Sequence, residues 1–238
     1  MPALSLIDLT LSTPEENLAL DEALLVECEE TSLESLRFWE SPVHFVVLGV
    51  AGRLALDVRE DECARSGIPI LRRASGGGTV LQGPGCLNFS LVLSLEARPE
   101  LRDVSASYAR ILGRTAAALG IETLAHKGTS DIARSGKKIS GNAQKRGRRA
   151  LLHHGTVLHR FDIDLVERFL AEPEKQPGYR ARRPHREFIE NVPLSREEVT
   201  ARIARAWEAL PESPPRPLRP LDRLIAERYG NPEWTRRF

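Results

Sequence analysis

The sequence predicts an α/β fold of the α+β type, in which helices flank a mixed or antiparallel sheet. Three observations predict it. Capped segments with helical periodicity are interspersed with short apolar runs typical of buried strands, and glycine-rich turns link several of those runs. Apolar residues make up 41% of the 238 residues, which is enough to bury a substantial core.

The first predicted helix begins at a capping box. Thr13 is the capping residue, Pro14 takes the first helical position and Glu16 the third. Apolar residues then surround much of the circumference as far as about Glu30. We therefore expect a largely buried helix.

Three strands are predicted next, at residues 44–50, 67–73 and 86–95. The third alternates polar and apolar residues, as a strand with two different faces does. The second leads into a run of three glycines, and the third returns after it. This arrangement resembles a wide hairpin and not the strand-to-helix passage of a P-loop or a Rossmann unit.

Two more helices are expected, over residues 104–119 and from a second capping box at 195–198. Gly120 ends the first of them. The residues expected to face the core are Val104, Tyr108, Ile111, Leu112, Thr115 and Leu119 on the first helix and Val199, Ile203, Ala206, Trp207 and Leu210 on the second.

The segments 131–146 and 150–160 between these helices are β-like, with a turn at Ser135-Gly136 in the first. After them, the proline-rich stretch 211–220 cannot form regular structure and is expected to be an extended connector. The predicted organisation is a main domain over 1–210, followed by a connector and a short helix, about Leu221 to Arg228, within 211–238.

Composition excludes several classes of protein. The formal net charge is only +1, which argues against a surface wholly committed to nucleic acid or to an anionic membrane. The three cysteines show no CxxC spacing, so neither a zinc site nor a disulfide framework is indicated. No signal peptide and no apolar run of ~20 residues is evident. A cytoplasmic protein without a membrane partner is expected.

The glycine run is the first candidate site. Gly76, Gly77 and Gly78 permit a positive φ and allow a ligand to approach the backbone N–H groups, which can cradle an anion. Arg72 or Arg73 can supply a full charge and a bidentate fork. The alternative interpretation is a mobile hairpin tip with both arginines in solvent.

The second candidate site is the basic hairpin. Lys137 and Lys138 are adjacent in a strand, so only one of them can face a given pocket. A lysine beside a phosphate and a carboxylate would stabilise charge that develops during acyl-phosphate exchange. A solvated basic hairpin is the alternative. Nucleic-acid binding by the basic run 145–149 is disfavoured, because no aromatic residues interleave these charges.

His153 and His154 also point to opposite faces of their strand. They cannot both ligate one metal ion from a regular strand, and no carboxylate lies nearby at metal-ligand spacing. A packed and hydrogen-bonded role is expected for at least one of them.

Three of these segments together resemble the lipoate-protein ligase family, within the wider group that includes biotin ligases and octanoyltransferases. They are RRASGGGTVLQGPGCLNFS (72–90), SDIARSGKKISGNAQKR (130–146) and LLHHGTVL (151–158), in family order. STPEENLALDEALL and ERYGNPEWTRRF also look like the ends of the family's sequences. The resemblance therefore spans nearly the whole chain.

The resemblance implies a two-step acyl transfer in domain 1–210. Lipoate attacks the α-phosphate of ATP to give lipoyl-AMP, and a lysine of an acceptor lipoyl domain then takes the acyl group. Lys138 would contact the carboxyl carbonyl and the α-phosphate, and Val157 would help to line the acyl pocket. The residues implied for nucleotide or acyl-adenylate binding are Arg73, Ser75, Gly76, Gly77, Gly78, Thr79, Val80, Leu81, Asp131, Lys138 and His154, with Mg²⁺ expected through Asp131.

The chain departs from the family pattern at three positions: Gln82 where histidine is usual, Cys86 where asparagine is usual and Ser130 where asparagine is typical. Many ligases also carry a C-terminal accessory domain of about a hundred residues. Either a separate protein supplies that role or the short tail suffices.

Three alternatives stay open. Octanoyltransferases and lipoyl amidotransferases of this group use a cysteine thioester without ATP, but residues 127–131, KGTSD, contain no thiol, and Cys86 has no evident base partner. A biotin ligase is disfavoured because a glycine loop of GRGRxGR type is missing. The scaffold could also bind lipoate, an acylated domain or RNA without turnover.

Overall fold

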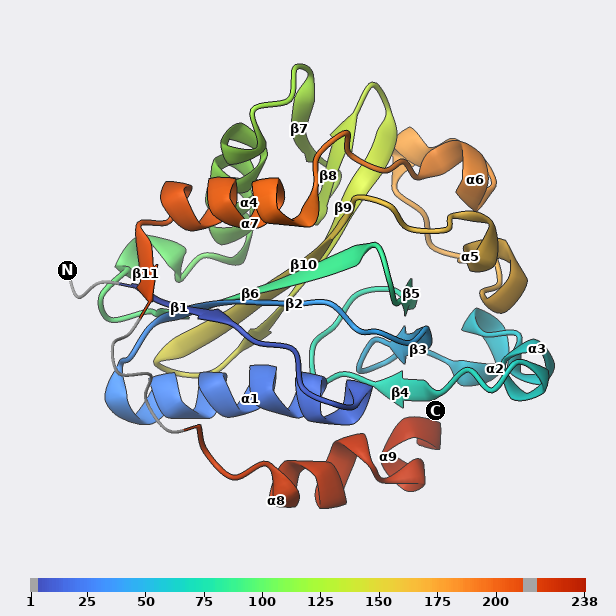
Figure 1. Ribbon diagram of the computed structural model, residues 1–238, viewed down its shortest axis with the longest axis horizontal. Helices are drawn as coiled ribbons and strands as arrows, with labels where there is room; N and C mark the ends of the chain where they lie inside the picture. Colours follow the sequence, from blue (N-terminus) through green and yellow to red (C-terminus); the bar gives the residue numbers. More distant parts are fainter. Residues whose placement is uncertain (1–3, 212–217) are drawn as a thin grey trace.

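The computed structural model describes residues 4–211 and 218–238 and contains two β-sheets (Figure 1). In the large sheet, β1 runs parallel to both of its neighbours, and the remaining pairs are antiparallel. The predicted mixed sheet is thereby confirmed. Its strands in spatial order are β11 (Ala209–Pro211), β1 (Leu4–Asp8), β2 (Ser35–Trp39), β6 (Cys86–Ser94), β10 (Ala150–Leu158), β9 (Lys137–Arg146), β8 (Asp131–Arg134) and β7 (Leu124–Lys127).

The small sheet has β3 (Phe45–Leu48) at its centre, with β4 (Ile70–Arg72) parallel on one side and β5 (Val80–Gln82) antiparallel on the other. The predicted wide hairpin is therefore wrong, because β4 does not pair with β6. The glycine run crosses from one edge of β3 to the other. Gly85, at φ 85°, then packs against the backbone of Arg160 as the chain passes to the large sheet.

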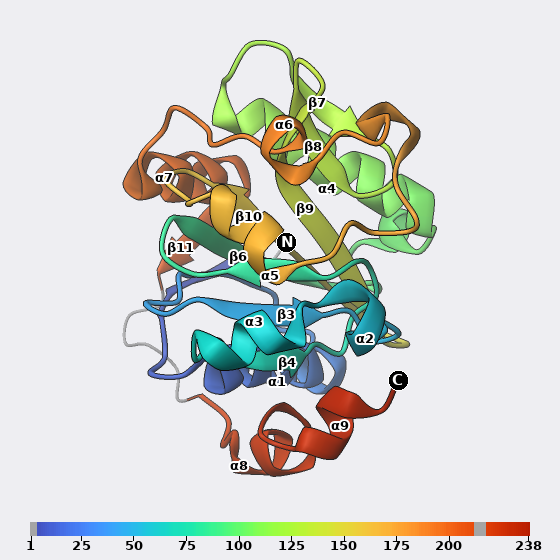
Figure 2. The same cartoon turned by 90° about the vertical axis from the view of Figure 1, so that its right-hand side faces the viewer.

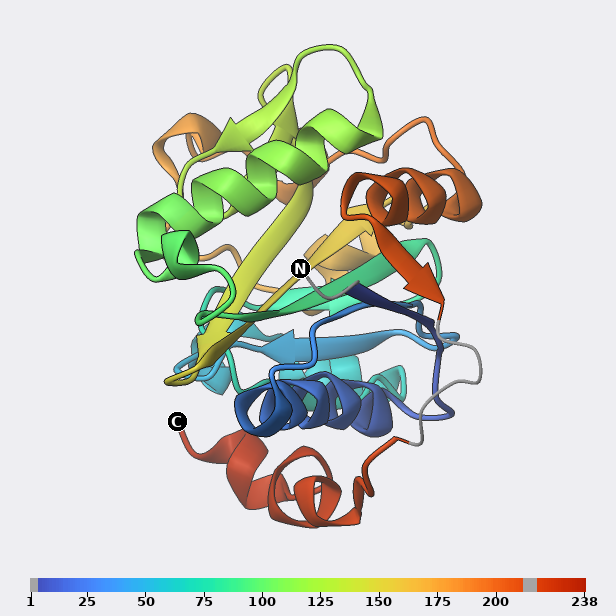
Figure 3. The same cartoon turned by 90° about the vertical axis from the view of Figure 1, so that its left-hand side faces the viewer.

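Helices cover both faces of the large sheet (Figures 1 and 3). The helix α1 (Pro14–Thr31) packs on β6 and β10 from one side, while α4 (Val104–Leu119) and α7 (Arg196–Ala206) pack on each other across the opposite side. Shorter helices are α2 (Leu54–Asp57), α3 (Glu60–Arg65), α5 (Asp164–Phe169), α6 (His185–Phe188), α8 (Asp222–Leu224) and α9 (Pro232–Arg236), with 3₁₀ turns at Pro99–Leu101 and Gly178–Arg180 and a π-helical turn at Ile225–Tyr229.

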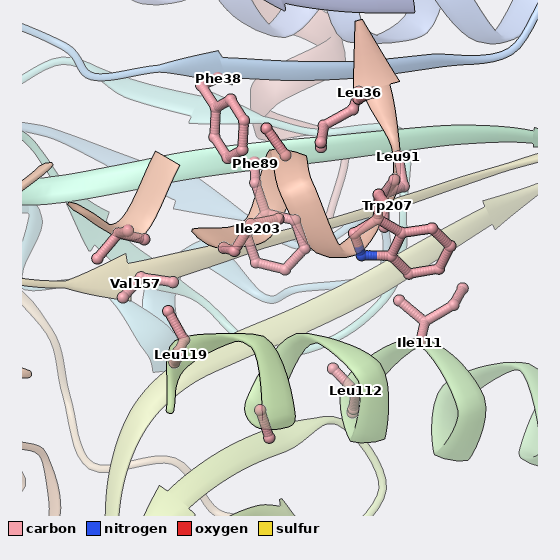
Figure 4. Packing of buried hydrophobic residues seen from close by; sticks show 14 of the residues in the cluster. Leu36, Phe38, Phe89, Leu91, Ile111, Leu112, Leu119, Val157, Ile203 and Trp207 are labelled. Atoms are coloured by element: carbon pink, nitrogen blue, oxygen red, sulfur yellow. The ribbon is translucent and has the colours of Figure 1, made fainter. Parts of the chain in front are cut away.

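The alternation in β6 is explained by these two layers. Its large apolar residues face α4 and α7, whereas Ser90 and Val92 lie on the side of α1. Figure 4 shows the larger cluster. Its central members are Leu36, Phe38, Phe89, Leu91, Ile111, Leu112, Leu119, Val157, Ile203 and Trp207.

The predicted helix ends are confirmed. Thr13 and Ser195 both form complete capping boxes, and Gly120 adopts the left-handed conformation after α4. The turn Ser135-Gly136 also has a positive φ at both residues, 48° and 80°, which is typical of a tight hairpin turn. Residues 212–217 of the predicted connector lie outside the described residues.

The predicted core faces need three corrections. Val104 is 49% exposed, since it lies in the first turn of α4. On α7, Ala204 is buried in place of Ala206. Leu210 is 61% exposed because the helix ends and β11 begins, so that the period changes from 3.6 to 2 and Ala209 turns inward instead.

None of the helices within residues 4–211 and 218–238 has the length and apolar character needed to cross a bilayer.

One polar residue of the core, His153 on β10, yields a pH prediction. Its ring stacks on Phe89 with centroids 6.2 Å apart and contacts Gln144 and Asn142 through its two nitrogens. Burial, with added repulsion from His154 and His126, lowers the pKa of His153 to about 3.

Below pH ~6.5 the unfolded chain therefore protonates this histidine while the folded chain does not. The free energy of unfolding consequently decreases as the pH is lowered. One such group contributes a slope of up to about 1.4 kcal/mol per pH unit down to pH ~3. We predict that His153→Gln flattens the decline in unfolding free energy between pH 6.5 and pH 4.5, measured by urea titration. An unchanged slope in the variant would contradict this account.

Candidate active site

A cavity of about 490 Å³ lies between the small sheet and the β8, β9 and β10 edge of the large sheet, and Figure 2 faces these elements. Segments far apart in the sequence line it. Its polar wall includes Arg73, Thr79, Asp131, Lys138, Asn142 and His154. Its apolar wall includes Leu81, Leu158, Phe161, Val166, Leu170 and Phe188.

The structure brings most of the predicted site residues to this one cavity. Those that line it are Arg73, Gly78, Thr79, Val80, Leu81, Asp131, Lys138 and His154. Ser75, Gly76 and Gly77 do not line it but lie in the loop behind. Val157 is fully buried in the main core and does not reach the cavity, which corrects its predicted place in the acyl pocket.

Arg73 is a buried cation that holds the glycine loop from within. Its guanidinium donates to the carbonyls of Gly76 (2.6 Å) and Gly78 (2.8 Å) and to the Ser75 hydroxyl (3.0 Å). Burial lowers the pKa of Arg73 to about 10. The partners of Arg73 among the described residues are all neutral, so no carboxylate offsets its charge there. The predicted bidentate fork is thus turned toward the loop.

The glycine run needs only one residue of unusual conformation. Gly77 has a φ of 87°, which most side chains would disfavour, whereas Gly76 and Gly78 keep ordinary values. Gly49 packs closely against this loop, because a Cβ added to Gly49 would lie 2.0 Å from the carbonyl oxygen of Gly77. The loop therefore rests directly on the turn after β3.

Lys138 enters the cavity from β9 and meets Asp131 on β8. Lys138 Nζ lies 2.7 Å from Asp131 Oδ1, and the Tyr179 hydroxyl donates to Asp131 Oδ2 at 2.8 Å. Burial and the Asp131 carboxylate raise the pKa of Tyr179, so its hydroxyl stays protonated. A Cβ on Gly141 would lie 2.7 Å from Lys138 Nζ, so Gly141 leaves room for the lysine in its present position beside Asp131. Lys137 does not line the cavity.

His154 joins the glycine loop to helix α1. Its Nε2 lies 2.6 Å from the Ser75 hydroxyl, which also accepts a hydrogen bond from Arg73. The ring's Nδ1 faces Asp21 Oδ2 at 3.9 Å. Burial would raise the pKa of Asp21, but Arg37, at 2.6 Å, together with His154 outweighs burial and lowers it. Sequence reasoning missed Asp21. It could have been found as a carboxylate on a helix that was predicted to be largely buried.

Sequence reasoning also missed the segment that closes the cavity after α5. Gln176, Arg180 and His185 line it, and each has a buried side-chain atom without a hydrogen-bond partner. Gln82, a departure from the family pattern, does as well. The usable signal was the density of arginine and histidine in 180–186, a segment that the sequence analysis left without a role.

Cys86 shows no sign of an activated thiol. Its side chain is 1% exposed and belongs to an apolar cluster, and burial raises its pKa to about 12. None of the cavity-lining residues in the described ranges is a cysteine.

The model of the lipoyl protein ligase A/B catalytic domain matches residues 13–207, which include every residue named in the cavity. The chain belongs to this family. The expectation of a lipoate ligase or octanoyltransferase relationship is confirmed, as is that of a ligase-type enzyme at the level of the family.

Two curated relatives show the range of names in this family. A protein of Aeropyrum pernix provisionally named lipoate-protein ligase A is 30% identical over 93% of this chain and 78% of its own length. The octanoyltransferase LipM of Macrococcus caseolyticus is 25% identical over 95% of each chain.

Two solved structures share the fold. A lipoate-protein ligase A bound with ATP superposes with a TM-score of 0.82 at 24% identity, over 98% of both chains. The bi-partite lipoate protein ligase of Thermoplasma acidophilum, described with its E2 lipoyl domain, gives 0.80 at 23% identity, over 98% of this chain and 96% of that one. At this identity they confirm the fold class only.

The contact between Gly49 and the glycine loop predicts a steric effect. Gly49→Ala should destabilise the fold by about 1–3 kcal/mol, since the new methyl group would overlap the carbonyl oxygen of Gly77 in a loop that is held by hydrogen bonds from Arg73 and Val50. Gly113→Ala is the matched control, because nothing lies within 4 Å of a Cβ in this exposed part of α4. Urea unfolding of both variants is the measurement. Equal stability of Gly49→Ala and the wild type would show that the loop does not rest on this turn.

Proposed function

We propose that the chain is an ATP-dependent lipoate-protein ligase that activates lipoate as lipoyl-AMP and transfers the lipoyl group to a lysine of an acceptor lipoyl domain. One observation carries the proposal. The buried guanidinium of Arg73, which has no carboxylate partner among the described residues, and the ammonium of Lys138 line the same cavity.

The two walls of the cavity fit the two ends of such an intermediate. An acyl-adenylate joins an anionic phosphate to a long uncharged chain, and the cavity joins a polar wall that carries Arg73 and Lys138 to an apolar one. Its volume lies within the usual range for small-molecule sites, roughly 300–1,000 Å³. Buried cations interact strongly with a phosphate because the surroundings screen them weakly.

In the first step, a carboxylate oxygen of lipoate forms a bond to the α-phosphorus of ATP while the bond to the β-phosphate oxygen breaks, and pyrophosphate leaves. Negative charge accumulates on the α-phosphate oxygens during this exchange. Lys138 would turn from Asp131 to these oxygens, and Asp131 would keep its hydrogen bond from Tyr179. Arg73 would raise the affinity for the anion without leaving the loop.

In the second step, the amine of the acceptor lysine attacks the acyl carbon, AMP leaves and the amine loses a proton to solvent. The glycine loop and the segment around Arg180 would exclude water from the anhydride until the acceptor arrives. The bi-partite ligase of Thermoplasma acidophilum supports a lipoyl-domain acceptor and a separate accessory subunit for this chain too.

Asp131 is not a ready magnesium ligand in this arrangement. Both of its oxygens are engaged, one by Lys138 and the other by Tyr179, and the described residues contain no group of three or more metal-ligating side chains. The described side chains alone therefore form no ready-made Mg²⁺ site: an ion at Asp131 would need Lys138 to move away and phosphates of ATP as further ligands, so the expected Mg²⁺ stays a prediction and neither step above runs through it.

The second candidate function is an ATP-independent octanoyl or lipoyl transfer through a thioester. It is favoured by the resemblance to the LipM octanoyltransferase. It is disfavoured by the burial of Cys86 and by the cavity lining, which lacks a thiol in the described part of the chain.

A donor experiment tests the two functions against each other. The wild type and Cys86→Ala would each be incubated with an apo lipoyl domain, with ATP and lipoate in one reaction and an octanoyl carrier protein in the other. We predict that intact-mass spectrometry shows a lipoyl adduct in the first reaction only, and equally for both proteins. Acylation from the carrier protein, abolished in Cys86→Ala that remains folded, would replace the ligase by the thioester enzyme.

The position of Lys138 predicts its effect on activation. Lys138→Ala should lower the rate of lipoate-dependent pyrophosphate release by about 10²–10³-fold, as for the loss of one preorganised donor. Lys137→Ala, one residue away and outside the cavity, should stay within about twofold of the wild type. Full turnover by Lys138→Ala, or an equal loss in both variants, would remove Lys138 from its proposed role.

A further inference from the structure

The described C-terminal segment, Leu218–Phe238, lies beyond the end of the family model at residue 207, yet it packs against β4 and the turn after β3, which adjoin the glycine loop. In Figures 1 and 3 the helices α8 and α9 lie on the far side of α1, away from the large sheet, and α9 approaches β4. We propose that Trp234 and Arg72 are positioning residues through which this segment holds the glycine loop in its nucleotide-binding shape. The inference deepens the proposed function and rests on it for the identity of the nucleotide.

Arg72 is the first link. Its side chain is fully buried on the face of β4 opposite Arg73, away from the cavity. Its guanidinium donates to Gly49 O (2.9 Å) and Gly52 O (2.7 Å) on one side and to Thr235 O (2.7 Å) on the other. It thus joins the turn after β3 to the C-terminal segment.

Trp234 closes the link in the opposite direction. Its indole Nε1 donates to the carbonyl oxygen of Arg72 at 2.9 Å, and its ring lies beneath the guanidinium of Arg237, 3.7 Å from the ring centroid. Arg237 in turn donates to Val50 O at 2.9 Å. Trp234 in α9 and Arg237 just after α9 therefore each bind a backbone carbonyl next to the loop. The carbonyl of Arg72 lies just before the loop, and that of Val50 lies in the turn beneath it.

The turn passes this constraint to the loop. Val50 N donates to Ser75 O at 2.8 Å, and Gly49 leaves no room for a side chain beneath Gly77. Arg73, the residue after Arg72, holds the same loop from the cavity side. Arg73 accordingly holds the loop directly from the cavity side, whereas Arg72 joins the turn beneath the loop to the C-terminal segment.

A second anchor fixes the segment to α1. Glu22 accepts a hydrogen bond from the Tyr229 hydroxyl at 2.7 Å and pairs with Arg228. The preceding residue, Asp21, faces His154 and through it Ser75. The same turn of α1 therefore positions both the segment and the cavity.

The test compares two chemically matched substitutions in the full chain. Trp234→Phe removes the donor to Arg72 O but keeps an aromatic ring. Trp207→Phe makes the same change in the main core, where the indole nitrogen has no hydrogen-bond partner. Amide hydrogen exchange at residues 76–79, referenced to β6, is measured without ligand, and the ATP affinity is measured by calorimetry.

We expect Trp234→Phe to accelerate exchange in the loop selectively and to weaken ATP binding by roughly three- to tenfold, the effect of losing one hydrogen bond between neutral groups. Trp207→Phe should change neither quantity. Unchanged exchange in Trp234→Phe would overturn the proposal, and so would faster exchange with unchanged ATP affinity.

Two further outcomes are decided by the same design. If Trp234→Phe does not fold, Arg237→Gln, which removes the exposed donor to Val50 O, takes its place with the same expectations. If the wild type binds no ATP, the proposed ligase function fails, whereas the exchange measurement still decides whether the C-terminal segment positions the loop.

Discussion

The buried charge of Arg73 is the constraint on which the site depends. A guanidinium placed in low-dielectric surroundings must be hydrogen-bonded, and here backbone carbonyls of the glycine loop provide the partners. These partners hold the loop in place, and because they are neutral they do not cancel the charge of Arg73. Gly77 and the adjacent serine are explained by this arrangement, because Gly77 has a positive φ and a Cβ on it would lie 3.0 Å from the Arg73 guanidinium, while the Ser75 hydroxyl accepts from the same group.

At two places in the fold, adjacent residues point in different directions, one toward the site and the other toward the C-terminal segment. Arg72 and Arg73 point to opposite faces of β4, one toward the C-terminal segment and the other toward the cavity. Asp21 and Glu22 do the same on α1, with His154 on one side and Tyr229 on the other. A short segment beyond the residues matched by the family model is thereby joined by hydrogen bonds to β4 and to the turn beneath the glycine loop.

The sequence was sufficient where local rules decide the structure. The capping boxes at Thr13 and Ser195, the turn at Ser135 and the alternation in β6 follow from side-chain chemistry and period, and all are observed. The pairing of β4 with β3 could not be predicted, because it joins residues far apart in the sequence and no local pattern determines it. For the same reason the motif indicated Lys138 but could not show that its partner, Asp131, also accepts a hydrogen bond from Tyr179. Tyr179 lies 41 residues after Lys138 in the sequence.

The most direct test of the account is a crystal structure with a lipoyl-adenylate analogue whose acyl-phosphate link is replaced by a non-hydrolysable sulfamate. The account predicts that the sulfonyl oxygens lie about 3 Å from Lys138 Nζ and from backbone N–H groups at 78–79, with the acyl chain against Leu81 and its apolar neighbours. An analogue bound outside this cavity, or bound within it while Lys138 remains on Asp131 and out of reach of the sulfonyl group, would contradict the central claim.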